Sequence, residues 1–170
     1  TLNANTIAEN YTNTAVKLAA ALTGITGHTG TVEITGTPPT VDQLNTISTA
    51  TGGVVTATTS GTAAELALLT TGANDLITLT LTAGAAAATI DQLETINNAT
   101  AGTITLNDNT IAENYTDTAV KLAAALTGIT THTGDVTLTA GAAAATIDQL
   151  EVINNATAGT ITLNDNTIAE

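Results

Sequence analysis

Two long segments of this chain repeat earlier segments almost residue for residue. Residues 138–170 match residues 81–113 at an offset of 57, and residues 105–134 match residues 1–30 at an offset of 104. The difference, 104 − 57 = 47, indicates superunits of about 47 and 57 residues that alternate along the chain. In repeat proteins each unit buries its apolar face against its neighbours. We therefore expect residues 1–170 to form one continuous repeat array, cut at both ends from a longer chain.

The second recurring feature is a Thr followed three residues later by Glu or Gln, which is the capping box of a helix N-terminus. The Thr side chain accepts a hydrogen bond from a backbone N–H of the first turn, and the Glu or Gln accepts one from the Thr N–H. The pairs with this spacing are Thr6 and Glu9, Thr40 and Gln43, Thr62 and Glu65, Thr89 and Gln92, Thr110 and Glu113, Thr146 and Gln149, and Thr167 and Glu170. The sequence predicts a short helix after each box.

Short runs in which Val, Ile or Leu alternates with Thr precede these boxes. Alternation with a period of two is typical of a strand that is buried on one face. The runs span residues 31–35, 54–58, 76–82, 103–107, 135–139 and 160–164. They predict a Thr-bearing face that could contact other molecules, formed by Thr31, Thr35, Thr56, Thr58, Thr78, Thr80, Thr103, Thr105, Thr137, Thr139, Thr160 and Thr162.

The order of strand and helix predicts the fold class. Strands that alternate with helices through short connections pair in parallel, with right-handed crossovers. Because one face of every strand is polar, the helices should all cover the other face. We therefore expect an α/β fold, namely a repetitive α/β solenoid with a parallel β-sheet, short helices on one face and an exposed Thr-rich face. Each superunit would contain two strand–helix turns.

Charge and hydropathy exclude several classes of partner. The formal net charge is −13, and Lys17 and Lys121 are the only basic residues. Proteins that bind nucleic acid need clustered basic side chains to neutralise phosphates, so nucleic acid is not expected as a partner. No apolar run approaches the roughly 18 to 20 residues that a membrane-spanning helix requires, so membrane insertion is not expected either.

Few side chains in the sequence could perform catalysis. The serines are Ser48 and Ser60, and His28 and His132 occupy the same place in two copies of a unit. A nucleophile must lie within hydrogen-bond distance of its base, and a strictly repeating layout does not bring these residues together. We therefore expect no enzymatic activity and no cofactor.

A metal site is the alternative reading of the Asn-Asp-Asn turn that contains Asp108. Its oxygens are of the kind that Ca²⁺ binds. The first copy of the turn has Ala4 at the position of Asp108, however. Helix capping is therefore the better account, and no metal site is expected.

Runs such as TIDQLETINNATAGTITLND and TAAELALLTTGANDLITLT resemble the Thr/Ala-rich repeats of very large secreted cell-surface and adhesin-like proteins of bacteria, notably cyanobacteria. The resemblance implies a secreted, extracellular location at the cell surface and a structural or adhesive role. The calcium-binding repeats of some such proteins have a Gly/Asp-rich motif that this chain lacks, so calcium binding is not implied here.

These observations favour a structural repeat module of an extracellular fibre, sheath or surface layer that self-assembles through its repeats. The expected partners are copies of itself or adjacent repeats in a head-to-tail filament, because residues 162–170 repeat residues 1–9 with one change. One alternative is the stalk of a bacterial adhesin. Another is an ice-binding repeat, in which one grid with spacings of about 4.8 Å and 6.6 Å would contain Thr103, Thr105, Thr137, Thr139, Thr160 and Thr162.

Overall fold

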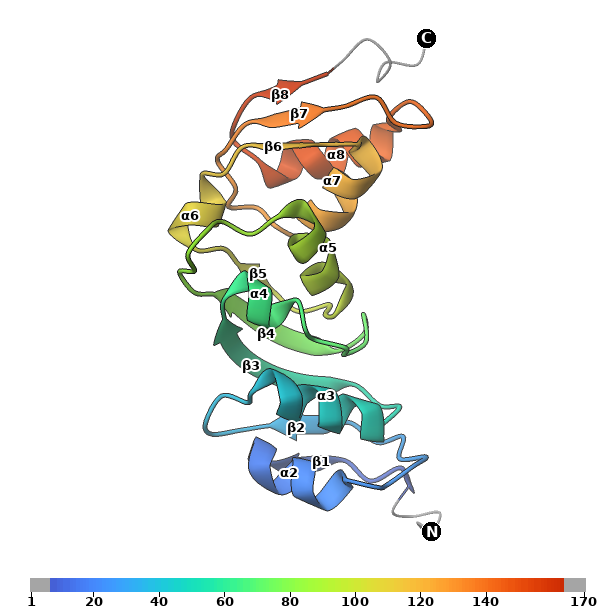
Figure 1. Cartoon of the computed structure of the whole chain (residues 1–170). Coiled ribbons are helices and arrows are strands. Elements are labelled where there is room, and N and C mark those ends of the chain that lie inside the picture. Colours follow the sequence, from blue (N-terminus) through green and yellow to red (C-terminus); the bar gives the residue numbers. More distant parts are fainter. Residues whose placement is uncertain (1–6, 164–170) are drawn as a thin grey trace.

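The computed structural model describes residues 7–163, which form an α/β fold of alternating strands and helices. The elements follow one another along the long axis of the molecule. In Figure 1, β1 (Tyr11–Asn13) and α2 (Ala15–Leu22) lie at one end, and α8 (Ile147–Ala156) and β8 (Ile161–Thr162) lie at the other. Neighbours in sequence are therefore neighbours in space.

The strands form two parallel sheets. In the first sheet, β1 is followed by β2 (Val32–Ile34), β3 (Val55–Gly61), β4 (Leu76–Leu81) and β5 (Ile104–Thr105). In the second sheet, β6 (Tyr115–Asp117) pairs with β7 (Val136–Leu138), and β7 pairs with β8. All six predicted strands are present, and every pairing is parallel.

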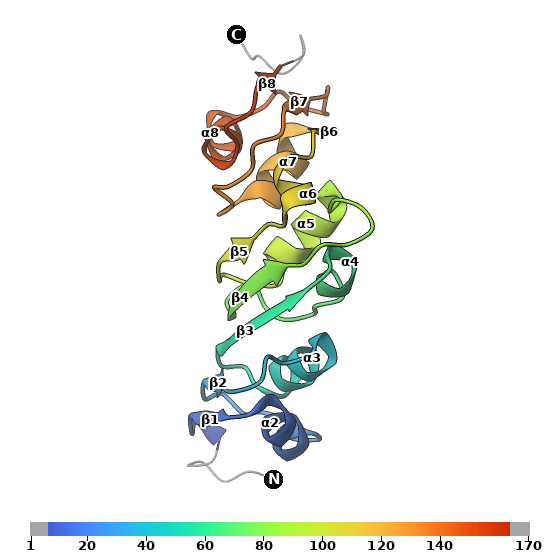
Figure 2. The same cartoon turned by 90° about the vertical axis from the view of Figure 1, so that its left-hand side faces the viewer.

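The prediction of one continuous sheet is wrong. Only residues 106–114 separate β5 from β6, and they include the short helix α6 (Asp108–Ile111). Two parallel strands in one sheet need a crossover of roughly a dozen residues or more, so β6 does not pair with β5 and begins a new sheet. In Figure 2, β1 to β4 lie to the left of α2 to α4, whereas α8 lies to the left of β7. The two sheets thus lie on different sides of the helices in this view.

The helices form a layer that continues across the gap between the sheets. The members not yet given are α3 (Val41–Ala50), α4 (Ala63–Leu66), α5 (Ile90–Asn98) and α7 (Ala119–Leu126). Within it α2 contacts α3, α4 contacts α5, α5 contacts α7, and α7 contacts α8. The direct contact of α5 with α7 bypasses α6 and links the two parts of the molecule.

Aliphatic side chains fill the space between strands and helices. On β4, Ile77 and Leu79 are fully buried, as are Leu93 and Ile96 on α5. Alternate residues of a strand and residues three or four apart on a helix share one face, so the two patterns meet in a single core. Each such side chain contributes roughly 1.5–3 kcal/mol by burial.

Helix starts account for most of the Thr-Glu and Thr-Gln pairs. Capping boxes are present at Thr40 with Gln43, Thr62 with Glu65, Thr89 with Gln92, and Thr146 with Gln149. At α5, Gln92 N donates to Thr89 Oγ1 (3.2 Å) and Thr89 N donates to Gln92 Oε1 (3.0 Å). Thr6, Thr167 and Glu170 lie outside the described residues, so those two predicted boxes stay predictions.

The capping box predicted at Thr110 and Glu113 is wrong. Helix α6 begins after Asn107, whose Oδ1 accepts a hydrogen bond from Thr110 N (2.9 Å). Asn is at least as good an N-cap as Thr, and it stands three residues earlier. The Thr110 side chain is completely buried, and its hydroxyl accepts from Ala88 N (3.1 Å). This residue therefore joins two units and does not cap a helix.

Two glycines show how closely successive units approach. A Cβ atom at Gly53 would lie 2.1 Å from the carbonyl oxygen of Gly30, and one at Gly102 would lie 2.3 Å from that of Ile77. Both glycines stand where the chain leaves a helix and enters the next strand. Only glycine fits there, because the preceding unit's backbone occupies the space.

Candidate functional site on the threonine face

The threonines predicted to share one face of the strands lie at the surface. Nine of the twelve are exposed, and Thr78, Thr137 and Thr139 are partly buried. Their neighbours along the strands, such as Ile77 and Leu138, are buried. The predicted orientation of the strands is therefore confirmed, and the helices do not cover the hydroxyl groups.

The strand register places several hydroxyl groups side by side. Thr58 lies opposite Thr78 in β3 and β4. One row runs from Ser60 to Thr80 and Thr105, and another runs from Thr116 to Thr137 and Thr162. Neighbouring parallel strands are about 4.8 Å apart, so each row is a short ladder of hydroxyl groups.

The ladders do not join into one grid. Thr105 belongs to the first sheet and Thr137 to the second, so the predicted continuity between them is wrong. Within the first sheet, Glu33 stands between Thr12 and Thr56, and Leu76 stands opposite Thr56. The face thus has two separate Thr patches, and the first is interrupted by one acidic and one apolar side chain.

The two histidines are buried at the corner where a helix leads into a strand. Nε2 of His28 donates to the carbonyl oxygen of Glu9 and Nε2 of His132 to that of Glu113, both at 2.8 Å. Each imidazole stacks on a tyrosine ring of the same copy, with 5.1 Å between ring centroids. The repeated geometry indicates a packing role.

Burial shifts the pKa values of two groups at the second of these corners. It lowers the pKa of His132, because the charged imidazolium is poorly solvated there. It raises the pKa of Tyr115, and the nearby Glu113 adds to this effect. Both shifts favour the neutral form of the side chain.

The serines do not meet the histidines. Ser48 donates to Asp75 Oδ2 (2.9 Å), and Ser60 is exposed on the Thr face. Asp75 is itself buried and accepts two further bonds, from Val55 N (2.7 Å) and Gly72 N (2.9 Å). These contacts fix the entry into β3 and β4 and do not resemble a nucleophile with its base.

Neither a cluster of metal-ligating side chains nor a membrane-spanning helix occurs in the part of the chain that the structure describes. Within residues 7–163, no group of three or more His, Cys, Asp or Glu side chains is placed to hold a metal ion. Asp108 is exposed in the first turn of α6, where a negative charge interacts favourably with the helix dipole. No helix in this range has the length and hydropathy that a membrane crossing requires.

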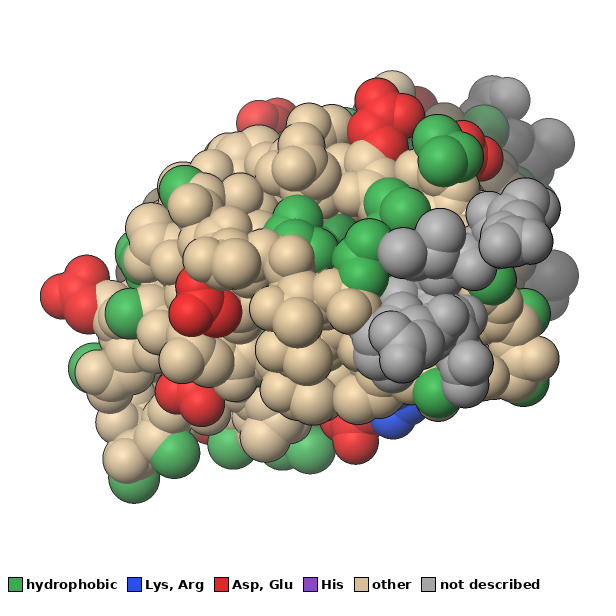
Figure 3. Space-filling model, turned by 90° about the horizontal axis from the view of Figure 1, so that it is seen from above, with side chains coloured by type: hydrophobic (Ala, Val, Ile, Leu, Met, Phe, Trp, Pro, Cys, Tyr) green, Lys and Arg blue, Asp and Glu red, His purple; other side chains and the backbone are tan. Residues whose placement is uncertain are grey.

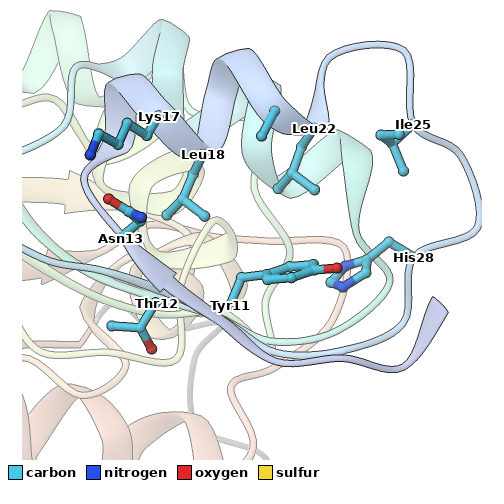
Figure 4. Close-up of a pocket in the computed structure, with 9 residues that line it drawn as sticks. Tyr11, Thr12, Asn13, Lys17, Leu18, Leu22, Ile25 and His28 are labelled. Atoms are coloured by element: carbon cyan, nitrogen blue, oxygen red, sulfur yellow. The ribbon is translucent and has the colours of Figure 1, made fainter. Parts of the chain in front are cut away.

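A pocket of about 380 Å³ opens at the end of the molecule formed by β1 and α2. Figure 4 shows the Tyr11 and His28 rings side by side at its base, with Leu18 and Leu22 above them on α2. Lys17 lies at its edge. The sequence did not reveal this pocket, because the second copy of the same residues lies inside the array and is covered.

No known protein family, curated protein or solved structure matches this chain.

Proposed function

We propose that the chain is a structural repeat module: an α/β solenoid that serves in an extracellular fibre, sheath or surface layer and assembles through its repeats. The observation that carries the proposal is the stacking of units in sequence order along one axis, with α2 and α8 at opposite ends (Figure 1). In such an array, length follows from the number of units, which is the property that a spacer or fibre needs.

The contacts between units support this reading. Within each sheet, every strand pairs with the next strand in the chain, and α2 contacts α3, α4 contacts α5, α5 contacts α7, and α7 contacts α8. The stability of such a protein is the sum of the stabilities of its units and of the contacts between neighbouring units. Units can therefore be added without forming a new core.

The chemistry of the surface supports an extended scaffold over an enzyme. Within the described residues, Ser48 bonds to Asp75 and does not meet a histidine, and the hydroxyl ladders lie outside the core on two patches. The net charge of −13 keeps separate molecules from collapsing into non-specific aggregates. The extracellular location rests on the resemblance to bacterial surface repeats.

The stalk of an adhesin uses the same stiffness and remains the main alternative. A separate binding domain at the end of the native protein would distinguish an adhesin stalk from a fibre. An ice-binding role is less favoured, because Glu33 and the gap between β5 and β6 interrupt the ladder of hydroxyl groups. A thermal-hysteresis assay on the purified protein tests it directly, and growth of ice crystals at the normal freezing point would exclude it.

The test of the structural role measures length. Small-angle scattering is recorded for the chain and for a variant in which residues 81–137 are duplicated in tandem. We expect the longest dimension to increase while the radius of the cross-section stays constant. A rounder particle, or a cross-section that grows with the insertion, would refute the solenoid and with it the proposed function. Electron microscopy of native material would then distinguish fibre from stalk.

A further inference from the structure

The first unit exposes a surface that the second copy of that unit buries. Residues 7–30 and 111–134 have the same sequence except at two positions. Tyr115, Ala125 and Ile129 of the inner copy are buried, whereas Tyr11 and Ile25 are only partly buried and Ala21 is exposed. The inner copy therefore shows what fits on the outer one.

The structure covering the inner copy is the unit that contains α5. Lys121 Nζ forms an ion pair with Asp91 Oδ1 (2.5 Å), and the bond to this carboxylate raises the pKa of Lys121. The side chain of Asn97 donates to the carbonyl oxygen of Thr127 (2.6 Å). The Tyr115 hydroxyl donates to the carbonyl oxygen of Ala88 (2.8 Å).

The opposite end of the molecule has the complementary surface. The unit containing α8 repeats the sequence of the unit containing α5, with Thr95 replaced by Val152. In the unit containing α5, Ile90 and Leu106 are 7% and 4% exposed. Their counterparts in the unit containing α8, Ile147 and Leu163, are 78% and 39% exposed. Figure 3 looks onto this end and shows hydrophobic side chains exposed near its middle.

We propose that α8 of one molecule docks on α2 of a second copy and reproduces the contact of α5 with α7. This inference rests on the proposed structural function and names the contacts through which assembly occurs. Asp148 takes the place of Asp91 and pairs with Lys17 of the next copy. Asn154 takes the place of Asn97 and donates to the carbonyl oxygen of Thr23. The Tyr11 hydroxyl donates to the carbonyl oxygen of Ala145, the counterpart of Ala88.

The contact joins two different surfaces and does not close on itself. Repetition of it generates an open, head-to-tail assembly. The docking contacts named above come from residues 145–161 of one molecule and residues 11–30 of the next.

The test uses two variants of α2 and compares self-association by sedimentation velocity over a range of protein concentrations. Ala21→Lys places a long charged side chain where Ala125 of the inner copy is completely buried. Val16→Lys is the matched control, because Val16 is 67% exposed and Val120, its counterpart on the covered helix, is still 63% exposed. We expect Ala21→Lys to weaken association at least tenfold, and Val16→Lys to associate like the native protein.

A second arm tests the pairing of Lys17 with Asp148. Lys17→Asp and Asp148→Lys alone each place like charges at the docked contact and should associate more weakly. In a mixture, each contact between one variant and the other pairs opposite charges, so the two variants should alternate and recover the association. Both positions are exposed, so melting temperatures that match the native value show that the variants fold.

The outcomes separate the contact from the function. A native chain that stays monomeric, equal effects of Ala21→Lys and Val16→Lys, or a mixture no better than its components would overturn the docking. If scattering still shows an elongated particle, the structural role survives that result. A compact particle would refute the function itself.

Discussion

The hydroxyl of Tyr115 donates a hydrogen bond of 2.8 Å to the carbonyl oxygen of Ala88 and so ties β6 to the loop before α5. Tyr115→Phe should lower the free energy of unfolding by about 1–2 kcal/mol, because a buried carbonyl loses its partner. Tyr11→Phe is the matched control at protein concentrations at which the chain is monomeric, since within residues 7–163 of one molecule the Tyr11 hydroxyl has no hydrogen bond of this kind. Urea titration of both variants measures the difference, and equal losses would contradict the assigned role.

The N-cap of α5 provides a second prediction. Thr89→Ala removes one half of a capping box and should cost about 1 kcal/mol. Thr14 precedes α2, but its side chain makes no capping hydrogen bond, so Thr14→Ala should cost less. The measurement is the midpoint of unfolding in denaturant, compared between variants whose unfolding free energy has the same dependence on denaturant concentration. A larger loss for Thr14→Ala would show that the boxes do not determine the stability of these helices.

Asp75 connects several turns of the array through one buried carboxylate. Asp75→Asn leaves one acceptor oxygen and points an N–H₂ group at donors, so we expect a loss of about 3 kcal/mol or more. Asp135 is exposed and accepts a bond from Thr160 N alone among the described contacts. Asp135→Asn should therefore cost about 1 kcal/mol or less. Thermal unfolding followed by circular dichroism compares the two, and similar losses would argue against Asp75 as the central acceptor.

The close approach of backbones at Gly102 provides a fourth prediction. Gly102→Ala forces the new Cβ against Ile77 and should cost about 3 kcal/mol, at the upper end of the range for overpacking. The nearest atom to a Cβ at Gly84 is 3.5 Å away, so Gly84→Ala should be neutral. Chemical denaturation of both variants provides the measurement. A tolerated Gly102→Ala would mean that adjacent units can move apart at low cost.

His132 should make stability depend on pH. Burial lowers its pKa in the folded state, so the unfolded chain binds the proton first as the pH falls below about 6.5. The contribution of neutral His132 to the free energy of unfolding is therefore complete above about pH 6.5. It is lost as the pH falls toward the lower pKa of the folded state. His132→Gln should remove this component. Unfolding free energies of both proteins between pH 8 and pH 5 measure it, and parallel curves would show that His132 does not contribute.

The alternation of aliphatic and Thr residues was enough to predict the strands that carry it. In β4, a slip of one residue would bury the hydroxyls of Thr78 and Thr80 and expose Ile77 and Leu79, so the pattern allows one orientation. Strands β1 and β6 were missed. Each has only three residues, Tyr-Thr-Asn or Tyr-Thr-Asp, which is too short for a visible alternation. These residues are extended because they pair with β2 or β7.

Features that depend on contacts between units were the ones that sequence reasoning did not find. The spacing of Thr110 and Glu113 predicts a helix cap, yet the Thr110 hydroxyl instead accepts a hydrogen bond from the buried N–H of Ala88. Thr118 caps α7 without any Glu or Gln three residues later, and its Oγ1 accepts from Lys121 N (3.5 Å). The docking surface at α2 is likewise invisible in the sequence, because identical residues are covered in one copy and open in the other.

The contact between α5 and α7 has a consequence for the gene as well as for the protein. Residues 81–113 recur as residues 138–170, so recombination between the copies would add a block of 57 residues that contains both α5 and α7 and therefore the same contact. No compensating mutation would be needed, because each side of the new junction already has its partner. The length of this molecule is therefore a trait that can change in whole steps between one generation and the next.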